Sequence, residues 1–164
     1  FAAGDRGIPT ATVTPAGSRP ALADFGWFGQ LYQCAIDPTP MAIATERAPK
    51  VLNWVERMDD LSWLPVEGDE GWVPADGLDP ATVDLLREIG RTYAPFMIAN
   101  AQALMSGVDE VICEIDGQTY RQGPFKYQAK CLQWLREAHA TLAPEDRARV
   151  DAVLAGTGCE VLVE

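Results

Sequence analysis

The stretch SRPALADFGWFGQLYQ (residues 18–33) decides how this chain folds. A turn at Ser18-Arg19-Pro20 leads directly into a block that is apolar on nearly all sides, which predicts a helix over 21–36. Its side chains form two neighbouring stripes at helical spacing, so we expect the helix to be buried among other helices. Gly26 and Gly29 lower its helix propensity, which indicates close approach of a second helix. The stripes are Leu22, Phe25, Gly29, Tyr32 and Ile36 in the first, and Phe28, Leu31 and Ala35 in the second.

Asp24 is the acid in this block, and its place explains its presence. It follows the natural N-cap position, Ala21, by three residues, so its carboxylate can accept a hydrogen bond from the N–H of residue 21. The carboxylate also lies near the positive end of the helix dipole. Alanine cannot supply the reciprocal bond of a Ser or Thr cap, which forgoes about 1 kcal/mol. We therefore interpret Asp24 as a structural capping residue, with a catalytic carboxylate as the lesser alternative.

Composition limits the classes of partner. The chain has 164 residues with a formal net charge of −11, which argues against nucleic acid and against anionic membranes. The four cysteines lack any C-x-x-C spacing and have apolar neighbours, which is typical of reduced thiols in the cytoplasm. With a single histidine and no close ligand pair, we expect no metal site.

The pattern of apolar residues predicts a mostly helical chain. Residues 1–17 are interpreted as a loop or leader, and DPTP (37–40) as the end of the first helix, with Thr39 capping a short helix to Arg47. Pro49 begins another helix, and its buried face is expected to comprise Val51, Leu52, Val55 and Met58. Residues 62–78 form a turn-rich connection.

The second half of the chain mixes helices with a small sheet. A helix from Asp79-Pro80 should break or kink at Pro95 and stop at Gly107. Residues 109–122 alternate around Asp116-Gly117, which predicts a β-hairpin. Two further helices follow, the first with Phe125, Leu132 and Leu135 inward, and CEVLV (159–163) is expected to add a third strand.

Three motifs together resemble the C-terminal helical domain of glutathione transferases. They are the Asp24-containing block, DPTP, and RAPKVLNWVERM (47–58), in which Trp54 matches the late-helix tryptophan of the family. The match covers residues 18–63, and Ala21 departs from the Ser or Thr of the family's capping box. Residues 64–164 resemble a C-terminal extension of some bacterial glutathione-transferase-like proteins, on the segments PFMIANAQAL, IDGQTYRQGPFKYQAKCLQWL and GTGCEVLVE.

The resemblance implies a division of labour in a longer parent protein. A thioredoxin-like N-terminal domain would bind glutathione and activate its thiol, because the thiolate is the nucleophile. The helical domain would contribute an apolar pocket for a small electrophilic co-substrate, and the first helices of the family's domain, upstream of this segment, would form a homodimer contact. This chain alone would then contain no catalytic residue. The alternative is a non-catalytic interaction or scaffold module that uses the same helical fold.

Several residues are candidates for binding, each with a plainer interpretation beside it. Trp27 and Tyr32 would line the apolar pocket or pack in the core, while Tyr120 and Arg121 would bind an anion or end a solvated strand. A small basic spot at Lys126 and Lys130 is expected on a helix surface. His139 lacks a nucleophile partner in the sequence, and nothing in the sequence activates the Cys131 thiol.

Overall fold

The computed structural model describes residues 18–62, 64, 68, 71–74 and 77–164. The predicted leader 1–17 lies outside these residues. The chain divides into two compact units, residues 1–74 and 75–164, each of which we describe by itself. The sequence predicts a boundary after residue 63, whereas the structure has it after residue 74. Within the described residues the fold is mostly helical with a small antiparallel sheet, and none of the helices there is long and apolar enough to cross a membrane.

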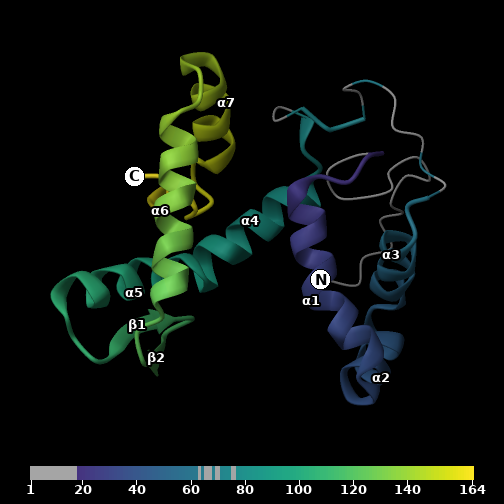
Figure 1. Cartoon of the computed structure of the whole chain (residues 1–164), viewed down its shortest axis with the longest axis horizontal. Coiled ribbons are helices and arrows are strands. Elements are labelled where there is room, and N and C mark those ends of the chain that lie inside the picture. Colours follow the sequence, from purple (N-terminus) through teal and green to yellow (C-terminus); the bar gives the residue numbers. More distant parts are fainter. Residues whose placement is uncertain (1–17, 63, 65–67, 69–70, 75–76) are drawn as a thin grey trace. The chain divides into compact units, whose positions relative to one another are not determined.

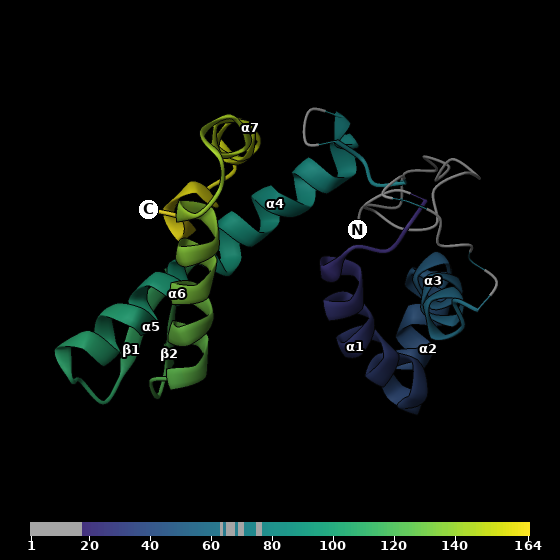
Figure 2. The ribbon, with the colours of Figure 1, turned by 45° about the horizontal axis from the view of Figure 1, so that its top comes forward.

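The first unit contains three helices, α1 (Leu22–Ile36), α2 (Pro38–Arg47) and α3 (Pro49–Asp59). They lie side by side in both views (Figures 1 and 2), with contacts between all three pairs. Asp37 ends α1 and caps α2, since its Oδ1 accepts a hydrogen bond from Thr39 N at 2.9 Å. The cap is thus Asp37 and not the predicted Thr39. Proline in the first turn begins both α2 and α3, where its missing N–H costs nothing.

The turn before α1 is hydrogen-bonded to residues 71–72, which follow α3 in the chain. Ser18 N donates to Gly71 O at 3.0 Å, and Trp72 Nε1 donates to Pro20 O at 3.4 Å. The Arg19 guanidinium lies 4.3 Å from the centroid of the Trp72 ring, a cation–π contact. These contacts fix the turn from which α1 begins.

The second unit contains α4 (Pro80–Thr92), α5 (Ala94–Ser106), β1 (Val111–Ile115), β2 (Gln118–Gln122), α6 (Lys126–Ala140), α7 (Pro144–Leu154) and the 3₁₀ helix η2 (Glu160–Leu162). Pro95 lies in the first turn of α5, which explains the break between α4 and α5. The strands pair in register from Val111–Gln122 to Ile115–Gln118. The predicted turn is present, because Asp116 and Gly117 both have positive φ, 55° and 70°.

The core of the second unit is built on α5. Ala94, Phe96, Met97 and Ala103 are buried there against Val111 of β1 and Leu132 of α6. On β1 the predicted alternation is correct, since Ile112 and Glu114 are exposed while Val111 is fully buried. The predicted inward face is wrong for Phe125, which precedes α6 and is exposed. It is also wrong for Leu135, because the face of α6 that contains Leu132, Arg136 and His139 turns inward instead.

The predicted third strand over 159–163 is wrong, because the sheet has two strands and residues 160–162 form η2. Gly156 and Gly158 both have positive φ, at 74° and 82°, and turn the chain just before this segment. Cys159 and Leu162 then enter the core against α5. Apolar alternation alone could not separate a short strand from one 3₁₀ turn.

Candidate functional site

The two apolar stripes of α1 have different environments in the structure. Phe28, Leu31 and Ala35 of the second stripe are half-buried and face the other helices of the unit, with Asp24 at their N-terminal end. The first stripe, which we call the outer α1 stripe, comprises Leu22, Phe25, Gly29, Tyr32 and Ile36, and every one of these residues is exposed. Leu22 is 88% exposed and Ile36 is 65% exposed. The expectation of a helix buried on all sides is therefore wrong for this face.

Gly29 leaves an open notch in the middle of the outer α1 stripe. A Cβ added at Gly29, or at Gly26, would meet no atom within 4 Å. The predicted close approach of a second helix is thus absent from the described part of the first unit. Glycine inside a helix costs about 0.5–1 kcal/mol relative to alanine, and no contact within the described residues offsets that cost.

Asp24 closes the start of α1 as a structural group. Ala21 N donates to Asp24 Oδ2 at 2.8 Å, which is the half of the capping box expected from the sequence. Ala21 itself makes no side-chain hydrogen bond, since a methyl group has no acceptor. Asp24 is 2% exposed, and its bonded carboxylate points into the unit rather than toward solvent, where a substrate would enter.

Trp27 and Tyr32, the candidate pocket residues, do not converge. They are five positions apart, which places them about 140° apart around the helix axis. Tyr32 contacts the ring of Phe28 at 5.3 Å between centroids, while both Trp27 and Tyr32 remain exposed. Neither residue lines the cavity beside His139 or the one beside Lys126.

Tyr120 and Arg121 are neighbours on β2, so they point to opposite faces of the strand. The Tyr120 ring contacts Phe96 edge-on at 5.8 Å, and its hydroxyl donates to Gln122 Oε1 at 2.7 Å. Arg121 Nη1 pairs with Glu110 Oε2 at 2.8 Å. The structure therefore does not bring them together as an anion site.

Lys126 and Lys130 are exposed on α6, as expected of a helix surface, and Cys131 is half-buried on the flank of the same helix. All four cysteines are free thiols. Burial raises the pKa of the Cys113 thiol and that of the Cys159 thiol, so both favour the protonated form. A thiol held in its protonated form is a poor nucleophile.

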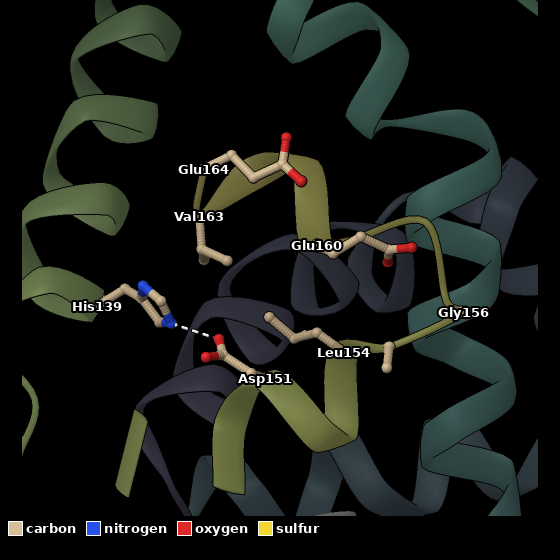
Figure 3. Close-up of a pocket in the computed structure, with 8 residues that line it drawn as sticks. His139, Asp151, Leu154, Gly156, Glu160, Val163 and Glu164 are labelled. Atoms are coloured by element: carbon tan, nitrogen blue, oxygen red, sulfur yellow. Dashed lines mark hydrogen bonds and ion pairs between the residues drawn. The ribbon is translucent and has the colours of Figure 1, made fainter. Parts of the chain in front are cut away.

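His139 has a partner that the sequence did not reveal. Its Nε2 lies 2.7 Å from Asp151 Oδ1, which joins α6 to α7 at the edge of a cavity of about 480 Å³ (Figure 3). The carboxylates of Glu160 and Glu164 also line this cavity but point away from the His139–Asp151 pair. The lining contains no Ser, Thr or Cys, so it offers the pair no hydroxyl or thiol side chain as a nucleophile. We interpret it as a structural tether between two helices.

Asn100 has a structural role that the sequence analysis did not predict. It is 0% exposed within α5, where its side chain bonds both backbone groups of Phe125, the residue that precedes α6. The signal available in the sequence was an asparagine inside the largely apolar run PFMIANAQAL. A buried amide at such a place must find partners, which favours a role in fixing a second segment.

Neither the comparisons with known proteins nor the arrangement of possible metal ligands indicates a further site in the described residues. Comparison of the chain with protein-family models, with curated proteins and with solved structures gave no significant match. Among the described residues, no group of three or more His, Cys, Asp or Glu side chains could hold a metal ion. Among the described features, the outer α1 stripe therefore gives the strongest indication of a function.

Proposed function

We propose that this chain is a non-catalytic protein-interaction module, and that the outer α1 stripe is its binding surface. The observation that carries the proposal is the exposure of this stripe along the full length of α1. Contiguous exposed apolar surface of this kind is typical of interaction sites. Covering it would contribute on the order of 5 kcal/mol before the cost of association.

The composition of the stripe points to a helix with an uncharged apolar face as the occupant. The five residues of the stripe include no charged group, so a charged partner surface would lose hydration without compensation. The notch at Gly29, between Phe25 and Tyr32, leaves room for a helix to cross α1 at short distance.

Photo-crosslinking at single positions tests this proposal. A photoreactive amino acid is placed at Phe25, at Ile36, or at the exposed control Gln30, which lies outside the stripe. We expect one discrete adduct from positions 25 and 36 in the native cell and none from position 30. The adduct protein, once identified and purified, should bind the chain directly.

Gly29→Ala then separates binding from folding. Since an added Cβ meets nothing in the chain, this variant should unfold at a higher urea concentration and yet bind the purified partner at least about tenfold more weakly. Equal labelling at all three positions, or unchanged affinity of Gly29→Ala, would refute the proposed surface.

A second candidate function rests on the capping contact of Asp24. The bond from Ala21 N to Asp24 Oδ2 is the local feature on which the glutathione-transferase resemblance depends. On that basis the first unit would have the fold of the helical domain of this family. It would then contribute an apolar co-substrate surface to a glutathione-dependent enzyme of the cytoplasm, with glutathione bound elsewhere in the parent protein.

Retention on glutathione resin and turnover of a generic electrophile test this candidate, using the longest form of the protein that its gene encodes. Retention and turnover would favour the enzymatic function, and a variant such as Trp27→Ala should then raise KM for the electrophile. Absence of both would leave the interaction module.

A further inference from the structure

A second, independent surface lies on the solvent side of α6. Tyr127, Lys130 and Trp134 succeed one another at helical spacing on this side and all are exposed. The rings of Tyr127 and Trp134 meet edge-on at 6.2 Å, and Lys130 Nζ lies 4.9 Å from the centroid of Trp134. These contacts hold the three side chains together as one ridge, which we call the α6 ridge.

The α6 ridge is not part of the core of the second unit. The opposite side of α6 makes the internal contacts, through the buried Leu132 and through Arg136, whose guanidinium donates to the carbonyl oxygens of Val161 and Leu162. Arg136 is thereby turned away from the ridge. The ridge thus includes a tryptophan, Trp134, that is 47% exposed.

The solvent side of α6 is basic in the first half of the helix and acidic in the last half. Lys126 and Lys130 are exposed in the first half of the helix, and Glu137 is exposed in the last half. In the described structure neither lysine forms an ion pair within 4 Å, although the chain as a whole has a net charge of −11. A face that is basic at one end and acidic at the other is complementary to its own antiparallel copy.

From this pattern we propose that α6 mediates antiparallel association with a second copy of the chain. With a two-fold axis between Gln133 and Trp134, Lys130 of each copy lies opposite Glu137 of the other. The two tryptophans then lie beside the axis and cover each other, which removes from water the largest side chains of the ridge. This ion pair occurs twice by symmetry, at the margin of an aromatic centre. This proposal does not depend on the outer α1 stripe, whose residues belong to a different unit.

Sedimentation of the full chain at low salt over a range of concentrations tests the proposal. We expect a monomer–dimer equilibrium in which Trp134→Ala abolishes the dimer. Lys130→Glu and Glu137→Lys should each raise the dimer Kd about tenfold, since each places like charges together at two sites. The double variant Lys130→Glu/Glu137→Lys should restore the wild-type Kd.

The matched control is Glu56→Lys, which makes the same reversal of charge on the exposed side of α3. It should leave the dimer Kd unchanged, and circular dichroism should show unchanged helicity in every variant. A wild-type chain that stays monomeric at all concentrations would overturn the proposal. So would a dimer whose Kd the double variant fails to restore, since the second copy would then occupy another surface.

Discussion

Asn100 holds both backbone polar groups of Phe125. Its Nδ2 donates to Phe125 O at 2.9 Å, and its Oδ1 accepts from Phe125 N at 2.7 Å. The side chain of one helix thereby fixes the residue from which the next helix begins. This reciprocal pair accounts for a fully buried amide in a mostly apolar helix.

Asn100→Leu should therefore destabilise the second unit more than its change in volume explains. It leaves the N–H of Phe125 without a partner and removes one of the two hydrogen bonds to Phe125 O, which also accepts from Ala129 N at 3.4 Å, at a cost of about 1–3 kcal/mol. Urea unfolding followed by the fluorescence of Trp134, the one tryptophan of residues 75–164, reports on this unit once the other four tryptophans are replaced by Phe. Gln102→Leu, an exposed position on the same helix, is the control and should change stability by less than about 0.5 kcal/mol.

Ala21→Ser should stabilise the first unit. Residue 21 has the extended backbone of an N-cap, with φ −96° and ψ 171°, and it lacks only a side-chain acceptor. A serine hydroxyl would complete the capping box begun by Asp24 and contribute about 0.5–1 kcal/mol. Thermal unfolding measures the gain. In an Asp24→Asn background the gain should be smaller, and an equal gain there would show that the two groups do not act together.

Gly90→Ala should disrupt the packing of the turn at Gly158 against α4. A Cβ at residue 90 would lie 2.7–2.8 Å from the backbone of Gly158, with no flexible side chain to yield. We expect a loss of about 1–3 kcal/mol in the free energy of unfolding. Gly123→Ala, where an added Cβ meets nothing within 4 Å, should be neutral or slightly stabilising.

The Cys159 thiol should make stability depend on pH in the alkaline range. Burial raises its pKa above the ordinary value of 9.0, so the folded state binds this proton more tightly than the unfolded state does. Its contribution to the free energy of unfolding is fully present when the pH is below the ordinary pKa of the thiol. This contribution is lost as the pH rises through the pKa of the folded state. Urea unfolding at neutral pH and at about pH 10 should show a decline that is smaller in Cys159→Ala. An identical decline in both proteins would contradict this role.

Local chemistry explains what could be predicted from the sequence. Pro49, Pro80 and Pro95 mark helix starts because of what proline does to its own backbone, and Asp116-Gly117 marks the hairpin because both residues tolerate positive φ. The half capping box of Asp24 is equally local. None of these signals requires knowledge of the rest of the fold.

Features that depend on distant packing could not be predicted in the same way. A helix with two apolar stripes does not indicate which one the chain will cover, and in α1 the covered stripe is that of Phe28 and not that of Phe25. His139–Asp151 and Asn100–Phe125 join segments 12 and 25 residues apart, which no spacing rule connects. Trp27 and Tyr32 were grouped by residue type, whereas helix geometry separates them.

Two phenylalanines of the same helix provide the most direct test of the binding surface. Phe25 lies on the exposed outer α1 stripe, and Phe28 lies on the half-buried stripe. Phe25→Glu and Phe28→Glu therefore introduce the same change at an exposed and at a half-buried position of one helix. Urea unfolding of the first unit should give a cost of about 1 kcal/mol or less for Phe25→Glu and at least twice that for Phe28→Glu. Equal costs, or a larger cost for Phe25→Glu, would show that the stripe is already covered within the chain and is not a binding surface.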